Sequence, residues 1–140
     1  MKIFQSKGIK FEEGFADVLM TYSKKTWGKS AAKFATTQED RYQGTDLFVL
    51  ETPIDVTLNF WHKRRTKRIG TLSFDGLKIN FGLRFGNAFK TFPIPVLVIG
   101  VDCAVDMEDT NLWATLENLK TQAKNILDFG FDSYFAATEE

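Results

Sequence analysis

The 140-residue sequence has few residues of several types that mark whole classes of protein: one cysteine (Cys103), one histidine (His62) and three prolines. A single cysteine excludes an intramolecular disulfide framework and favours a reducing compartment. The lone histidine argues against zinc sites built from several nitrogen and sulfur ligands, and against a histidine-based nucleophilic triad. The sequence also lacks a glycine-rich phosphate loop and a dinucleotide fingerprint. The acidic residues therefore remain as the main candidates for a functional site.

Long apolar runs and a net charge are missing as well. No uncharged stretch approaches the roughly 20 apolar residues that cross a bilayer, and residues 1–7 lack the apolar region of a signal peptide, so we expect a cytoplasmic protein without a membrane segment. The net charge of zero hides an asymmetry, because residues 1–90 carry 16 Lys/Arg against 9 Asp/Glu, while residues 91–140 carry 2 against 9. This pattern indicates a basic face for a polyanion, unless the two segments mix in space.

The hydrophobic pattern predicts one mixed α/β domain over residues 1–140, with a central β-sheet flanked by helices. Apolar residues at helical spacing predict two helices, at 11–25 and at 109–129, the second ending near Gly130. Residues 38–44 are polar and predict a loop. Alternating or continuous apolar runs predict six strands, at 31–37, 45–50, 54–60, 69–74, 77–85 and 95–101. The run at 95–101 is apolar throughout, which is typical of a central strand.

Two aspartates are the first candidates for chemistry. Asp46 begins one predicted strand and Asp55 lies near the start of the next, so a tight turn between the strands would bring both carboxylates to one edge of the sheet. A carboxylate on a half-buried strand face is costly unless it is neutralised, and a hard cation with oxygen ligands is one solution. The alternative is an ordinary pair of exposed aspartates at strand ends.

Three short motifs resemble one known superfamily. Residues 8–19 (GIKFEEGFADVL) resemble the first helix of Mrr-type restriction endonucleases and related resolvases. Residues 43–49 (QGTDLFV) are similar to that family's Gly-x-Asp-apolar strand, and residues 53–57 (PIDVT) stand where it has an apolar-(Asp/Glu)-x-Lys strand. The motifs occur in the family's order over roughly residues 8–60. The resemblance is to the PD-(D/E)xK, or restriction-endonuclease-like, nucleases.

This resemblance implies a site for one or two Mg²⁺ (or Mn²⁺) ions beside the scissile phosphate, held by Glu12, Asp46, Asp55 and the main-chain carbonyl of Val56. It implies a restriction-endonuclease-like fold and hydrolysis of DNA phosphodiester bonds. The departure is at Thr57, which occupies the catalytic position where the family usually has lysine and cannot supply its positive charge. Glu12 also has an ordinary structural explanation, since an acidic residue in the first turn of a helix interacts favourably with the helix dipole.

The most basic segment follows the second aspartate strand and is expected to bind phosphates with little sequence preference. An ordinary solvated loop would have the same composition. The segment's candidate nucleic-acid-binding residues are His62, Lys63, Arg64, Arg65, Lys67 and Arg68.

The sequence therefore leaves two candidate functions open. The first is a small Mg²⁺-dependent endonuclease or resolvase-like nuclease acting on double-stranded or branched DNA. The second is a nuclease-fold protein with little or no turnover that binds nucleic acid or a protein partner, as an accessory factor of a phage or mobile element. With no separate specificity domain, DNA recognition would come from DNA structure, from the symmetry of a homodimer or from a partner protein.

Overall fold

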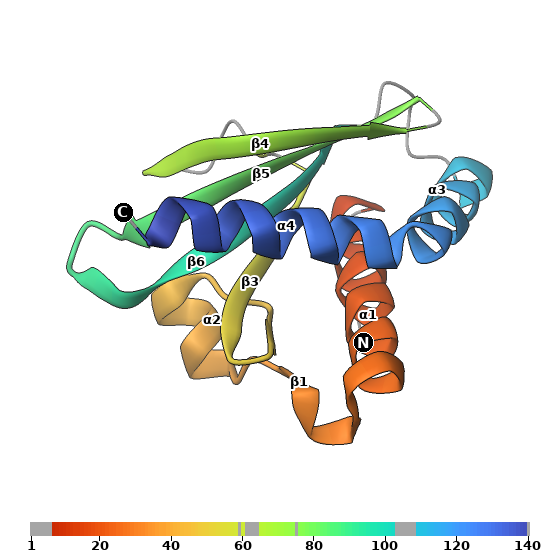
Figure 1. Cartoon of the computed structure of the whole chain (residues 1–140). Helices are drawn as coiled ribbons and strands as arrows, with labels where there is room; N and C mark the ends of the chain where they lie inside the picture. Colours follow the sequence, from red (N-terminus) through yellow and green to blue (C-terminus); the bar gives the residue numbers. More distant parts are fainter. Residues whose placement is uncertain (1–6, 59, 61–64, 75, 103–108, 140) are drawn as a thin grey trace.

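The computed structural model describes residues 7–58, 60, 65–74, 76–102 and 109–139. It confirms the predicted fold class, because these residues form one mixed α/β domain with a six-stranded sheet flanked by helices (Figure 1). The strand order is β1-β2-β3-β6-β5-β4, with β3 and β6 parallel and every other neighbouring pair antiparallel. The strands are β1 (Ala32–Phe34), β2 (Leu47–Val49), β3 (Thr52–Thr57), β4 (Thr66–Phe74), β5 (Leu77–Gly86) and β6 (Thr91–Asp102).

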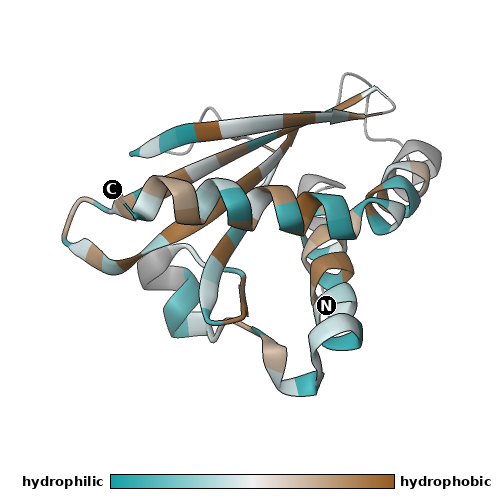
Figure 2. Cartoon of the chain, in the orientation of Figure 1, coloured by the Kyte–Doolittle hydropathy of each residue, from teal (hydrophilic) through white to brown (hydrophobic). Residues whose placement is uncertain are grey.

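One face of the sheet packs against helices α1 (Lys7–Trp27) and α4 (Ala123–Thr138). Helix α1 buries Phe11, Phe15 and Leu19 completely, and their spacing of four residues places them on one helical face. In Figure 2 the apolar colouring follows the strands where α4 crosses them. The main core therefore lies between this helical layer and the sheet.

The opposite face of the sheet has a smaller apolar cluster of Phe60, Phe92, Val96 and Val98. With cover on both faces, every residue of β3 is buried, including the polar ones. Strand β6 is an inner strand, as predicted from its apolar run. The polar residues of β3 therefore lie inside the protein, where each needs a partner.

The prediction of a loop at 38–44 was wrong, because most of this segment is helix α2 (Thr37–Gln43). The Thr36 side chain accepts a hydrogen bond from the Glu39 backbone N–H, and the Glu39 carboxylate accepts one from the Thr36 N–H. This reciprocal capping box is readable as Thr-x-x-Glu in the sequence. Gly44 ends the helix in the left-handed conformation, with φ of 63°.

The single helix predicted at 109–129 is two helices, α3 (Asp109–Thr121) and α4, separated at Gln122. Helix α3 packs on α1, while α4 crosses the sheet. The apolar spacing continues through the break, so the sequence pattern does not reveal it. Gly130 does not end α4 but lies buried within it, where the missing side chain leaves room for the Phe81 ring.

The remaining strands agree with the predicted ones apart from shifts at their ends. The turn between β2 and β3 is shorter than expected and consists of Leu50 and Glu51, both with positive φ. None of the helices within the described residues has the length and apolar character needed to cross a membrane.

Candidate metal centre

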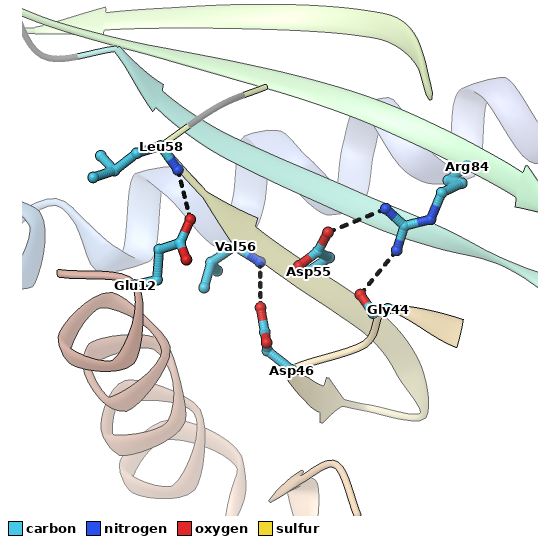
Figure 3. A network of polar contacts seen from close by, with 7 residues as sticks. All are labelled: Glu12, Gly44, Asp46, Asp55, Val56, Leu58 and Arg84. Atoms are coloured by element: carbon cyan, nitrogen blue, oxygen red, sulfur yellow. Dashed lines mark hydrogen bonds and ion pairs between the residues drawn. The ribbon is translucent and has the colours of Figure 1, made fainter. Parts of the chain in front are cut away.

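The candidate site forms where β2 separates from β3. The Asp46 N–H donates to the Ile54 carbonyl at 2.8 Å, which is the last backbone hydrogen bond between the two strands at this end. The next two N–H groups on this edge of β3 and the residue after it donate to side chains. The Val56 N–H donates to Asp46 Oδ2 at 2.8 Å, and the Leu58 N–H donates to Glu12 Oε2 at 2.9 Å (Figure 3). Residues two apart in a strand point their N–H groups the same way. Two of the three predicted acids thus line up along one edge of β3.

The Asp46 and Asp55 carboxylates lie close enough to interact directly. Burial, followed by the negative charge of Asp55 and a hydrogen bond with its carboxylate, raises the pKa of Asp46 to about 8; the Val56 N–H opposes this shift. Two adjacent carboxylates do not both ionise readily in a buried place. With its raised pKa, Asp46 carries a proton at neutral pH.

Arg84 on β5 provides the cation that faces Asp55. Its Nη1 donates to Asp55 Oδ2 at 3.1 Å and its Nη2 donates to the Gly44 carbonyl at 2.8 Å, across the neighbouring strand β6 (Figure 3). Only 10% of the Arg84 side chain and 5% of the Asp55 side chain are exposed. A buried, paired guanidinium stabilises the charged form of the carboxylate beside it.

The Glu12, Asp46 and Asp55 side chains line a pocket of about 720 Å³. Acidic residues of α1 and α2 extend its wall beyond the aspartate pair. The described residues that line it include no lysine or arginine and are Glu12, Glu13, Ala16, Asp17, Phe34, Asp40, Gly44, Asp46, Asp55 and Val56. The pocket therefore has the charge and the oxygen donors that suit a cation.

Comparison with protein-family models, with curated proteins and with solved structures gave no match. The candidate site is therefore supported only by the contacts within this chain. In the described part of the chain, no three histidine, cysteine or acidic side chains meet as a ready metal-binding group. The structure brings Asp46 and Asp55 together, while Glu12 lines the same pocket with one carboxylate oxygen on Leu58.

Thr57, Lys67 and Arg68 are not among the residues described as lining the pocket. Thr57 is 1% exposed and alternates with Val56, so it shares the sheet face of Asp55. Lys67 and Arg68 belong to the edge strand β4, which β5 and β6 separate from β3 by about 14 Å at ordinary strand spacing. They lie on this strand because β4 begins at Thr66, earlier than the predicted strand at 69–74.

Neighbouring residues of that strand also point to opposite faces, so its two cations do not form one surface. Arg65, just before it, is exposed, with φ of 61°. His62, Lys63 and Arg64 lie outside the described residues.

Sequence reasoning missed two contributors to the site. Arg84 is the only charged residue between Ile79 and Phe89, and a lone charge in such a strand is a recognisable sign of a buried ion pair. Asp40 lines the pocket because α2 is a helix, which the predicted loop concealed.

Gly44 offers a test of this arrangement. Its φ of 63° disfavours any side chain, and a Cβ there would lie 2.5 Å from Arg84 Nη2. Gly44→Ala is expected to lower the free energy of unfolding by more than the roughly 1–2 kcal/mol of left-handed strain alone. Gly76→Ala is the matched control, because Gly76 has φ of 77° and nothing within 4 Å of its Cβ position. Equal losses in urea titrations of both variants would contradict the close Gly44–Arg84 contact.

Proposed function

We propose that the protein is a metal-dependent phosphodiesterase, a nuclease of the PD-(D/E)xK type that acts on DNA with Mg²⁺ or Mn²⁺ at the Asp46–Asp55 pair. The observation that carries the proposal is the adjacent Asp46 and Asp55 carboxylates at the wall of an acidic pocket. Perturbed carboxylates in a pocket are typical of functional sites. A structural ion pair alone would account for Asp55 but not for the second carboxylate beside it.

The residues present fit a small hard cation. Mg²⁺ is usually held by one or two carboxylates together with water and substrate phosphate, so a cluster of three protein ligands is not required. Asp46 and Asp55 supply the two carboxylates, and the adjacent Val56 lines the same pocket. Glu12 is the third predicted ligand, and in this proposal its second carboxylate oxygen faces the same cation.

Each of these side chains has a definite task in this mechanism. Asp55 is held in place by its ion pair with Arg84, and Asp46 would have to give up its proton to ligate a cation. Glu12 ties α1 to β3 through Leu58 and so sets the width of the pocket. A divalent cation bound there would lower the pKa of an attacking water and offset negative charge on the phosphate oxygens.

Two features depart from the resemblance that the motifs suggest. Thr57 carries no charge, and the connection from β3 to β6 runs through the β4–β5 hairpin instead of the helix usual in that family. Catalysis would then depend on the cation for most of the charge stabilisation. We accordingly propose slow, metal-stimulated cleavage.

The proposed partner is DNA in the cytoplasm, double-stranded or branched. Among the described residues, phosphate contacts would come from Arg65, Lys67 and Arg68, at a distance of a few nucleotides from the pocket. Recognition through a homodimer or through a partner protein is part of this proposal.

A second candidate rests on the hydrogen bonds of the three acids. Glu12 and Asp46 each accept a β3 N–H, and Asp55 is paired with Arg84, so all three have structural partners. In that case they close the open edge of β3, and the protein binds nucleic acid or a protein without turnover. Metal affinity separates the two candidates.

The pH dependence of metal binding is the test. Because the pKa of Asp46 is raised to about 8, a cation must displace a proton below that pH, and the apparent Mn²⁺ affinity should rise about tenfold per pH unit up to about pH 8 and then level off. Calorimetry in buffers of different ionisation enthalpy would also show about one proton released at neutral pH. An absence of binding at pH 8.5 would favour the second candidate.

Stability without metal should move the opposite way. Because the folded pKa of Asp46 lies above its ordinary 3.8, the unfolded state binds fewer protons between about pH 4 and pH 8. The contribution of Asp46 to stability is therefore complete below about pH 4 and is lost as pH rises through about 8. Asp46→Asn should remove this pH dependence in urea titrations.

A further inference from the structure

The turn between β5 and β6 holds a phenylalanine almost entirely in solvent. Phe89 is 93% exposed, far more than any other large apolar side chain of the described residues. Single exposed apolar residues are ordinary on protein surfaces. Phe89 differs from such residues because it lies at the tip of a hairpin, in a turn held by hydrogen bonds, and next to a lysine.

The turn is built to fix Phe89 in place. The Asn87 side chain accepts hydrogen bonds from the Phe89 N–H (2.8 Å) and the Lys90 N–H (3.0 Å), and the Asn87 N–H donates to the Lys90 carbonyl (2.9 Å). Three bonds within four residues leave the backbone little freedom. Binding of the ring to a partner would therefore cost the rotation of the side chain but little backbone entropy.

One exposed lysine, Lys90, adjoins the ring in the chain. Residues 76–101 contain no aspartate or glutamate and include Lys78, Arg84 and Lys90. Arg84 is already engaged with Asp55, but Lys90 adjoins Phe89 and is exposed. An exposed aromatic ring beside a lysine, with Asp102 at the far end of β6 as the one acid of the two strands, matches a polyanion that has flat apolar groups, which is the chemistry of a nucleic-acid strand.

The same hairpin leads from the pocket to this tip. Val98 pairs with Asp55 on one side and with Gly82 on the other, which places Gly82 level with the pocket. From Gly82 to Asn87 the strand runs about 17 Å, the length of about five stacked nucleotides. Figure 1 shows this hairpin at the end of the sheet away from α3. One bound strand can therefore reach both the pocket and the tip.

We propose that Phe89 stacks on an unpaired base and that the protein selects nucleic acid with single-stranded segments, such as a fork, a flap or an open single strand. An intact duplex has no free base face to offer, so the ring would contribute to binding only where pairing is interrupted. This inference rests on the proposed function and specifies its class of substrate. Lys90 adds a phosphate contact that any strand can satisfy.

The experiment measures binding of three labelled probes in Ca²⁺ buffer: an oligothymidylate single strand, a forked duplex and a fully paired duplex. Phe89→Ala should weaken binding to the first two about tenfold and leave the duplex nearly unchanged. Phe89→Trp should restore affinity, with tryptophan fluorescence quenched on binding beyond that of the wild type. Phe135→Ala, at another half-exposed aromatic position on α4, is the control and should bind like the wild type.

The opposing outcomes are distinct. Unchanged affinity of Phe89→Ala for all three probes, or an equal loss on all three, would overturn the stacking role while leaving the nuclease proposal intact. Phe89-dependent binding to phosphatidylserine vesicles with no binding to the oligonucleotides would assign the tip to a membrane surface and overturn it as well. Failure of the wild type to bind any probe while still binding Mn²⁺ would overturn both this inference and the choice of DNA as substrate.

Discussion

Replacing Asp46 by asparagine is expected to abolish Mn²⁺ binding and to reduce metal-stimulated DNA cleavage by more than about 100-fold. Asparagine keeps an oxygen that can accept the Val56 N–H but cannot provide the negative charge that a cation requires. The fold should survive, because asparagine has nearly the shape of Asp46 and, like the protonated Asp46 at neutral pH, carries no charge. Calorimetry with Mn²⁺ and cleavage of supercoiled, single-stranded and branched DNA are the measurements.

Glu13→Gln is the matched control for this variant. Glu13 lines the same pocket but is exposed, and no side-chain hydrogen bond to β3 is described for it. Its replacement should leave Mn²⁺ affinity within a few-fold of the wild type, since only a more distant charge changes. Cleavage that persists in Asp46→Asn would place the activity in another site or in a contaminating enzyme.

The second large effect is expected at the buried ion pair. Arg84→Met should lower the free energy of unfolding by about 3–5 kcal/mol, because it leaves the buried Asp55 carboxylate without its cation and the Gly44 carbonyl without a donor. Methionine fills much of the space of the arginine stem, so lost packing contributes little. Urea unfolding followed by circular dichroism measures the change.

A double-mutant cycle isolates the pair itself. Asp55→Asn removes the buried charge, so the double variant should be more stable than the sum of the single losses predicts. Additive losses would mean that the two side chains stabilise the fold independently. Lys124→Met provides the control, because the exposed pair of Lys124 with Asp128 should contribute far less.

The parts of this protein that follow from local chemistry were predictable. Apolar residues recurring every four positions, as at Phe11 and Phe15, require a helix that buries one face. The continuous apolar run in β6 requires cover on both sides and hence an inner position. The pairing of Asp46 with Asp55 followed from two strands and a short turn, because antiparallel register is local once the turn is set.

Of the two wrong predictions about helices, the loop at 38–44 had a contrary signal in the sequence and the unbroken helix at 109–129 had none. The Thr36-x-x-Glu39 capping box marked the start of α2, although the segment that follows is polar and has no apolar stripe. The break at Gln122 had no such signal, since helical periodicity continues across it and only packing on two different surfaces separates α3 from α4.

By itself, the sequence determined the fold class, the inner strand and the two aspartates of the site, because periodicity and short-range pairing depend on neighbours within a few residues. Only the tertiary structure decided which cation meets Asp55. Arg84 lies 29 positions along the chain from Asp55, and they meet only because β5 and β3 both pair with β6. The pKa of Asp46 depends on the same assembly, since burial and the neighbouring charge arise only when distant strands close the sheet.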